Sequence, residues 1–190
     1  MAQIHGFPPI TAPEPRILIL GSMPGKASLQ ANQYYAHPRN SFWTIMAEIL
    51  TFDPALPYHE RVNALCSNHI ALWDVLQCCT RESSLDSDIE PTSIIINDLA
   101  AFLESHGQIS RICFNGAKAA DLYRKHVQST LTLRQSMLLY SRLPSTSPAN
   151  ARFSPQGETP GLDGGAQGSR EPVLKAKSSL DAIVKWLLDR

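Results

Sequence analysis

The sequence predicts an α/β fold, in which helices pack against a mainly parallel sheet of four strands. Three observations support this class. Four short apolar segments have the length of buried strands, segments with helical spacing of apolar residues lie between them, and the two kinds alternate along the chain. Such alternation is typical of layered domains with a parallel sheet. The chain has 190 residues, 43% of them hydrophobic, so we expect one domain spanning residues 1–190.

The four predicted strands are short and apolar. Residues 16–20 form the first, because a run of apolar residues ends at Gly21. Two further strands are predicted at residues 70–75 and 109–114, and a fourth at residues 137–143.

Parallel sheets bind their ligands beyond the carboxyl ends of the strands. Four segments are therefore expected to open at one edge of the sheet and to form the candidate site. These are residues 21–25, the loop after Val75, residues 115–116 and residues 144–150.

Helices are predicted where apolar residues recur every three or four positions. One spans residues 41–50, a second has Pro91 in its first turn, and a third starts at Gly116. Their apolar sides are formed, in order, by Phe42, Ile45, Met46 and Ile49, by Ile95, Leu99, Phe102 and Leu103, and by Ala119, Ala120 and Tyr123.

Residues 151–172 differ in composition from the rest of the chain. They hold five of its ten glycines and three prolines, without apolar periodicity. We predict a flexible surface loop inserted within one domain, because too few residues follow it to build a second core. A last helix is predicted after it, with one apolar side formed by Leu180, Ile183, Val184, Leu187 and Leu188.

Charge and cysteine content argue against several classes of protein. Seventeen basic and seventeen acidic residues give a formal net charge of zero, which disfavours a general polyanion-coating protein but permits one local basic face. None of the four cysteines belongs to a C-x-x-C pair, so no zinc or redox site is expected. Reduced thiols, no secretory leader pattern and no apolar run of about 18–20 residues predict a cytoplasmic protein without a membrane span.

Two segments carry more specific motifs. The string GSMPGKASLQANQYYAHPRNSFW starts at residue 21, and the string LPSTSPAN ends at residue 150. Alone, GSMPG indicates only a tight turn after a strand. The part AHPRNSFW resembles the AHP-x-N-x-FW segment of the mismatch-specific uracil/thymine glycosylases. The whole combination resembles the hypoxanthine (deoxyinosine) DNA glycosylases of the uracil-DNA glycosylase superfamily.

This resemblance runs from about residue 6 to residue 150, with further matches at ALWDVL, SSLDSDI and FNGAKA. It implies a three-layer α/β/α sandwich and an enzyme that flips a base out of DNA before hydrolysing its N-glycosidic bond. It implies neither a metal nor a cofactor. Hypoxanthine is the expected first substrate, with uracil and xanthine as further candidates.

Three residues match residues that the relatives use on the water and the base. Asn40 matches the catalytic asparagine of the hypoxanthine branch, which would position and polarise a water; alternatively it caps the helix at residues 41–50. Asn115 matches a base-reading asparagine, and is alternatively a turn residue before a glycine. Tyr35 matches the aromatic residue that stacks on the flipped base, and alternatively packs in the core.

The same resemblance assigns two loops to the base and to the DNA strand. The residues expected to line the base pocket are Gly21, Ser22, Met23, Pro24 and Gly25. The residues expected to grip the strand are Ser145, Thr146, Ser147, Pro148, Asn150 and Arg39. Pro148 after Ser147 also fits an ordinary helix start.

The sequence departs from its relatives at two places. Met23 stands where the mismatch-specific enzymes carry an asparagine that positions the water. Leu143 and Pro144 stand where the uracil-specific enzymes carry a histidine that stabilises the leaving base. The second departure favours the hypoxanthine branch over efficient uracil removal.

Further charged residues lie in or next to these loops. Those that could face phosphates are Lys26, Arg81, Arg142 and Arg152. The acidic candidates near the same edge are Asp74, Asp86 and Asp88. Asp74 is interpreted either as an auxiliary carboxylate or as a turn or cap residue.

Several functions stay open from the sequence. The alternatives are a mismatch-specific uracil-DNA glycosylase on the same scaffold, a DNA-lesion binding protein without catalysis, and a hydrolase of free nucleotides. The expected partner is DNA containing a deaminated base. An even charge balance predicts a monomer.

Overall fold

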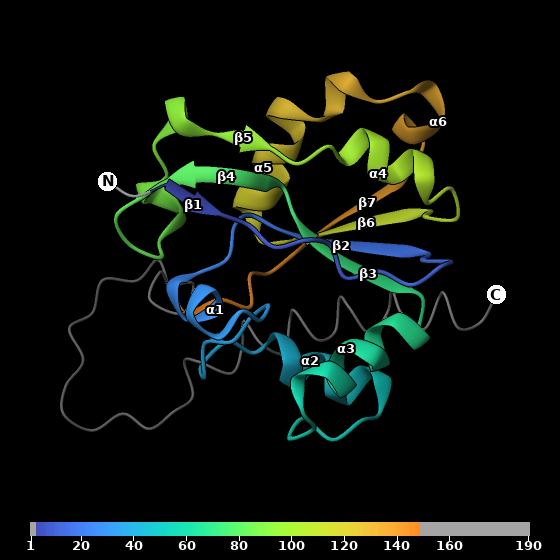
Figure 1. Cartoon of the computed structure of the whole chain (residues 1–190). Coiled ribbons are helices and arrows are strands. Elements are labelled where there is room, and N and C mark those ends of the chain that lie inside the picture. The colour runs from blue at the N-terminus through green and yellow to red at the C-terminus, as the bar shows by residue number, and fades with distance from the viewer. Residues whose placement is uncertain (1–2, 149–190) are drawn as a thin grey trace, which may run out of the picture.

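The computed structural model describes residues 3–148. Its centre is a four-stranded sheet with the order β3-β2-β6-β7 (Figure 1). The strands are β2 (Ile17–Gly21), β3 (Ile70–Asp74), β6 (Arg111–Asn115) and β7 (Leu139–Leu143). All three pairings are parallel, so the predicted α/β fold with a four-stranded parallel sheet is confirmed.

Helices cover both faces of this sheet and complete the predicted three layers. One face carries α2 (Phe42–Leu50) and α3 (Tyr58–Ser67). The other carries α4 (Leu99–Ser105) and α5 (Ala117–His126), as Figure 1 shows. The structure is therefore an α/β/α sandwich.

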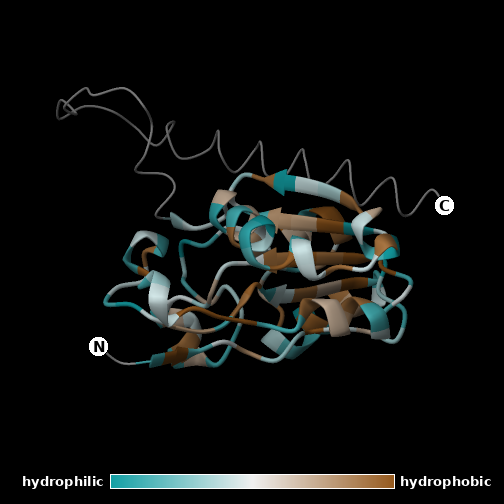
Figure 2. Cartoon of the chain, turned by 90° about the horizontal axis from the view of Figure 1, so that it is seen from above, coloured by the Kyte–Doolittle hydropathy of each residue, from teal (hydrophilic) through white to brown (hydrophobic). Residues whose placement is uncertain are grey.

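The side chains of β2 show how one strand serves both layers. Ile17 and Ile19 pack in the core that contains Phe42 of α2, whereas Leu18 and Leu20 pack in the opposite core with α4 and α5. Because neighbouring side chains of a strand point to opposite faces, a strand covered on both sides must be apolar at every position. Figure 2 shows the resulting concentration of hydrophobic residues in the central strands.

A second, smaller sheet was not predicted. It has the order β1-β4-β5, with antiparallel pairing of β1 (Gln3–His5), β4 (Leu76–Thr80) and β5 (Ile95–Ile96). The expected loop after Val75 is therefore wrong. The chain continues directly from β3 into β4, because Val75 and Leu76 still donate hydrogen bonds to the carbonyls of Gly21 and Ser22.

The predicted helix containing Ile95 starts later than expected. Ile95 and Ile96 form β5, and α4 begins at Leu99 after Asp98, whose carboxylate accepts the Ala101 N–H. Pro91 instead opens a single 3₁₀ turn. The apolar spacing that links residue 95 to residue 99 is shared by a strand followed by a helix, so periodicity alone could not place the boundary.

Shorter elements occupy the remaining connections. They are α1 (Lys26–Ala31), α6 (Leu133–Ser136) and three 3₁₀ turns, η1 (Asp86–Asp88), η2 (Pro91–Ser93) and η3 (Gln128–Thr130). The fourth strand begins at Leu139 rather than at Met137, which is 77% exposed and follows α6.

Some predictions concern residues beyond the described part of the chain. The insertion at residues 151–172, the last helix, Asn150 and Arg152 all lie outside residues 3–148. Among the residues that are described, no helix is long and apolar enough to cross a membrane. The four cysteines are free.

Candidate active site

Parallel pairing brings the last residues of the four strands to one edge of the sheet. Gly21 of β2 is in register with Asp74 of β3, and Asn115 of β6 with Leu143 of β7. The segments at residues 21–25 and 144–148 start from that edge. This arrangement unites the first and second sequence motifs, which are more than a hundred residues apart in the chain.

Gly21 is held in close contact with two polar side chains. A Cβ atom at this position would lie 2.3 Å from Oδ1 of Asp74 and 3.1 Å from the hydroxyl oxygen of Tyr35. Neither of these two side chains can easily move away, since the Asp74 carboxylate is buried and the ring of Tyr35 stacks on Phe42. Only glycine fits this packing.

Gly21→Ala should therefore destabilise the protein by roughly 1–3 kcal/mol, because the added methyl group displaces the Asp74 carboxylate. Urea unfolding measures this change. Gly25→Ala is the matched control, since the nearest atoms to its Cβ lie 3.7 Å away and its φ is −73°. Equal losses in the two variants would contradict the steric argument.

The segment at residues 21–25 is fixed from outside by residues 81–88. The Ser22 hydroxyl donates to Oδ1 of Asp86 at 2.8 Å, and the Arg81 guanidinium donates to the carbonyl of Pro24. The Lys26 N–H donates to the Ser84 hydroxyl at 3.0 Å. These three contacts hold residues 81–88, which have little regular structure, against the first motif.

Within the first motif the five predicted base-pocket residues differ in exposure. Met23 is 7% exposed and belongs to the core beneath the sheet, with Leu18 and Leu20 among its cluster. Ser22 and Gly25 are partly exposed, whereas Gly21 and Pro24 are buried. The roles of these residues toward a base stay predictions.

Arg81 cannot face phosphates as predicted. It is 3% exposed, and its Nε and Nη1 atoms have no hydrogen-bond partner among the described residues. Its charge lowers the pKa of Asp74 and of Asp86, and so stabilises the charged forms of these two acids. Lys26, Arg39 and Arg142 are exposed, which is compatible with the predicted contacts to a DNA backbone.

One carboxyl group is buried and a second is half-buried at this edge. The pKa of Asp74 is raised to about 7, mainly by desolvation and also by the charge of Asp86, while Arg81 opposes the shift. Desolvation also raises the pKa of Asp86, against the hydrogen bond from Ser22 and the charge of Arg81. Asp74 is a buried strand residue whose carboxylate caps no helix, so its interpretation as a turn or cap residue is wrong.

Tyr35 packs against the core, which was one of the two roles considered for it. Its ring stacks on Phe42 with 4.1 Å between centroids and 26° between planes, and its φ of +55° is rare for a residue with a side chain. Its hydroxyl is buried near the Asn115 amide. Burial raises the pKa of this hydroxyl and Asp74 raises it further, while a side-chain hydrogen bond with Asn115 opposes the shift. Stacking on a base stays a prediction.

Asn40 supports the start of α2. Its Oδ1 accepts the Phe42 N–H at 3.0 Å, which is the local turn expected of asparagine before a helix. The side chain is only half-buried. An amide oxygen has two lone pairs, so this contact leaves a second acceptor position for a water.

Asn115 holds the second motif. Its Nδ2 donates to the Thr146 hydroxyl at 2.9 Å, and its Oδ1 accepts the Thr146 N–H at 3.0 Å. These two bonds fix the orientation of the amide and leave one donor and one lone pair for a base. The Thr146 carbonyl in turn accepts the Ser41 N–H at 3.2 Å, so Asn115 is linked through Thr146 to the residue that follows Asn40.

The second motif packs tightly at its start. Gly116 has a φ of +104°, and a Cβ there would lie 2.9 Å from Cβ of Ser145. The hydroxyl of Ser145 accepts the Ser147 N–H at 3.2 Å. Thr146 is 5% exposed, so its side chain holds the loop together, while Ser145, Ser147 and Pro148 are partly exposed.

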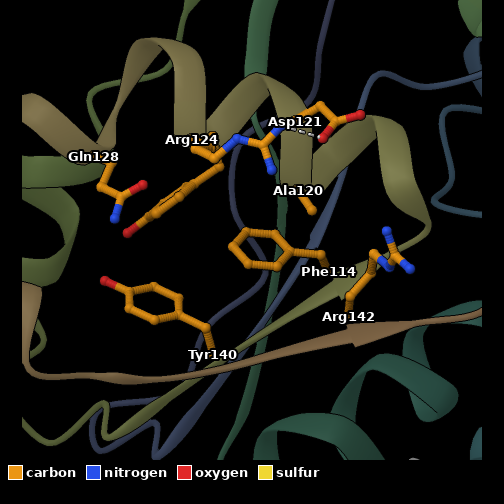
Figure 3. A pocket seen from close by; sticks show the side chains of 8 residues that line it. Phe114, Ala120, Asp121, Arg124, Gln128, Tyr140 and Arg142 are labelled. Carbon is orange, nitrogen blue, oxygen red and sulfur yellow. Dashed lines mark hydrogen bonds and ion pairs between the residues drawn. The ribbon is translucent and has the colours of Figure 1, made fainter.

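A cavity of about 410 Å³ lies elsewhere, between α5 and β7 (Figure 3). In Figure 3 the rings of Phe114 and Tyr140 lie side by side, the Arg124–Asp121 ion pair borders them, and Arg142 stands at one end. Apart from Arg142, no residue predicted to contact base or DNA lines it. We place the candidate site at the sheet edge and not in this cavity.

Two asparagine amides, a tyrosine hydroxyl and the carboxyl groups of Asp74 and Asp86 lie at this edge. Among residues 3–148, no group of three or more His, Cys, Asp or Glu side chains is arranged to hold a metal ion. Sequence reasoning included the acids but missed the Asn115–Thr146 pair, for which the sequence carries no signal.

A parallel α/β/α sandwich with these motifs at its carboxyl edge defines the class of protein. The sequence model described as the uracil DNA glycosylase superfamily matches residues 8–167. The chain belongs to this superfamily.

Two relatives share the name hypoxanthine DNA glycosylase. The protein from Methanosarcina acetivorans is 36% identical over 156 residues, which are 82% of this chain and 93% of the relative. The protein from Methanosarcina barkeri is 37% identical over 118 residues, 62% of this chain and 73% of the relative. A solution structure from M. acetivorans, described provisionally as a uracil DNA glycosylase, is 31% identical with a TM-score of 0.70. It matches 98% of this chain and 99% of that one.

Proposed function

We propose that this protein is a DNA glycosylase that removes hypoxanthine from DNA and leaves an abasic site. One observation carries the proposal: Thr146 bonds both Asn115 and Ser41, the residue after Asn40, so two distant parts of the chain meet at the carboxyl edge of the sheet. The two relatives named hypoxanthine DNA glycosylase support the choice of base. Uracil and xanthine are weaker substrates of the same site.

The proposed reaction starts with extrusion of the base from the duplex, since its sugar bond is inaccessible within the stack. Exposed Arg39 and the partly exposed Ser145 and Ser147 contact the strand. Tyr35 offers a face to the flipped base. Asn115 uses its remaining donor and lone pair on the lactam of hypoxanthine, which presents an N–H beside a carbonyl.

Bond cleavage places opposite charges on the sugar and on the departing base. Asn40 holds a water through its remaining lone pair and directs the water oxygen toward C1′ of the sugar. The new C1′–O bond forms as the C1′–N9 bond breaks, and its electron pair leaves with the base. An asparagine cannot take up the water's proton, so this proton passes to solvent.

We further propose a monofunctional enzyme that acts as a monomer in the cytoplasm. Three of the four free cysteines are buried, which suits a reducing compartment. A monofunctional glycosylase leaves the strand intact until alkali cleaves the abasic site. A single elution volume near 21.0 kDa in size-exclusion chromatography is the expected result for a monomer.

Base release from matched duplexes tests the proposal. Each duplex holds one inosine, uracil or xanthine, or a thymine mispair, and alkali reveals the abasic sites. We expect cleavage mainly at inosine, and only after alkali. Cleavage mainly at uracil would identify a uracil-DNA glycosylase instead. Binding without release from any duplex would identify a non-catalytic lesion-binding protein, and activity on free inosine monophosphate alone would identify a nucleotide hydrolase.

A further inference from the structure

Asp74 is an acidic residue at a buried position of the sheet, and no contact within the described part of the fold requires an acid there. It ends β3 at the carboxyl edge, is 3% exposed, and its Oδ2 has no hydrogen-bond partner among the described residues. Its Oδ1 lies against Gly21 of the first motif. A buried polar atom without a partner is destabilising, and a polar ligand that bonds it removes that cost.

A second buried polar group lies at the same place. The Tyr35 hydroxyl is buried near the Asn115 amide. A Cβ atom at Gly21 would lie 2.3 Å from Oδ1 of Asp74 and 3.1 Å from this hydroxyl, so both groups converge on Gly21. The strained backbone of Tyr35, with its φ of +55°, holds the hydroxyl there. Two such groups at one point of a candidate site indicate a polar ligand.

A departing base needs a donor for the negative charge that develops on its oxygen. At this edge the Ser22 hydroxyl is committed to Asp86, and the Asn115 amide is bonded twice to Thr146. Leu143 and Pro144, at the start of the second motif, offer no side-chain donor. The Asp74 carboxyl, whose Oδ2 has no hydrogen-bond partner among the described residues, is a further candidate donor.

Resting on the proposed function, we propose that Asp74 contacts the flipped base as a neutral carboxylic acid and donates a hydrogen bond to the oxygen on which negative charge develops. Its hydroxyl donates to the lone pair of hypoxanthine O6 that Asn115 leaves free. The proton stays on Asp74, and the released base takes its proton from solvent while the attacking water loses one. Entry of the base requires residues 21–25 or the Tyr35 ring to move, because Asp74 is otherwise covered.

The groups around Asp74 support its neutral form. The carboxyl of Asp86 faces it and disfavours a second negative charge, while Arg81 favours the ionised form; Tyr34 and Tyr35 are the other titratable neighbours. Desolvation is the largest influence and raises the pKa of Asp74 to about 7. Below this pH the acid can donate. Above it the carboxylate has no proton to donate and repels the departing base, so activity must fall as pH rises.

Single-turnover release of hypoxanthine from an inosine duplex between pH 5.5 and 9 tests this role, with protein in saturating excess. Well above pH 7, the wild-type rate should fall about tenfold for each pH unit. Asp74→Asn keeps a neutral donor and acceptor, so it should retain a rate within about fivefold of wild type at pH 6 and show no fall at alkaline pH. Asp74→Ala should lose about 10²–10³-fold at pH 6, the usual cost of removing one such donor.

Asp53→Asn is the matched control, since Asp53 is exposed and bonds only the Ala55 N–H of its own loop. It should behave as wild type at every pH. Thermal unfolding of each variant separates loss of structure from loss of chemistry. If Asp74→Ala is unfolded, the pH profile of folded Asp74→Asn decides alone.

Three results would overturn the proposal. A wild-type rate that rises with pH, together with an inactive but folded Asp74→Asn, would make Asp74 a general base. Wild-type rates in folded Asp74→Ala, or the same alkaline fall in Asp74→Asn as in wild type, would show that Asp74 does not touch the base. A wild-type protein that releases no hypoxanthine at any pH would instead refute the proposed function, and this proposal with it.

Discussion

Asn40→Ala should reduce release of hypoxanthine from an inosine duplex by at least about 100-fold, because the variant cannot position the attacking water. The same change removes the acceptor for the Phe42 N–H and should lower the melting temperature by a few degrees. Single-turnover base release and thermal unfolding measure the two effects. The loss of activity should far exceed what the loss of stability explains.

Asn40→Ser separates the two roles of this side chain. A serine hydroxyl can accept the Phe42 N–H and so preserve the start of α2. It is shorter than an amide and should not restore the water, so Asn40→Ser should melt near wild type and stay nearly inactive. Wild-type activity in Asn40→Ser would show that Asn40 is only a helix cap. Asn68→Ser, which changes a half-buried residue at the end of α3 and outside the site, serves as the control for the substitution itself.

Asn115→Ala should have the second-largest effect, because one side chain holds the second motif and is proposed to read the base. The variant leaves the Thr146 N–H and hydroxyl without their partners in a buried position, at a cost of about 1–3 kcal/mol for an unsatisfied group. We expect a marked loss of stability and base release reduced by more than 100-fold. Urea unfolding and single-turnover release are the measurements.

Asn115→Asp and Thr146→Val distinguish loop support from base reading. The aspartate can still accept the Thr146 N–H and the Thr146 hydroxyl, so the loop should hold, but it cannot donate to the carbonyl of the base. Asn115→Asp should therefore be folded and at least tenfold slower on inosine. Thr146→Val weakens the loop only and should be the milder change. If Thr146→Val loses as much activity as Asn115→Asp, Asn115 acts through the loop alone.

The apolar pattern of the sequence predicted the four strands of the main sheet and several of its helices, whereas α3 (Tyr58–Ser67) was not predicted. Leu18 and Ile19 belong to an unbroken apolar run, as a strand covered on both faces requires, and the recurrence of Phe42, Ile45 and Met46 indicated one face of α2. The carboxyl-edge rule then identified residues 21–25, 115–116 and 144–148 as neighbours. The local pattern predicts β2 and β3 because nearly all of their residues are buried and most are therefore apolar.

Local pattern failed where pairing partners decide the structure. The segment at residues 76–80 reads as a loop because Gln77 and Thr80 interrupt it, yet β1 and β5 supply the hydrogen bonds that make it a strand. Ile95 and Ile96 join that sheet rather than α4 for the same reason. Antiparallel pairing between segments far apart in the chain leaves no periodic signal in either one.

The burial, pKa and hydrogen bonding of the polar groups at the site depend on the tertiary structure. The sequence ALWDVL does not show that Asp74 is desolvated near Asp86. Nor does the sequence show that Arg81 is buried and donates to the carbonyl of Pro24. Nor does FNGAKA reveal that Asn115 is bonded twice to Thr146. The sequence fixes which residue types are present, whereas burial and the distances between charges, which set pKa and hydrogen bonding, arise only when distant segments meet.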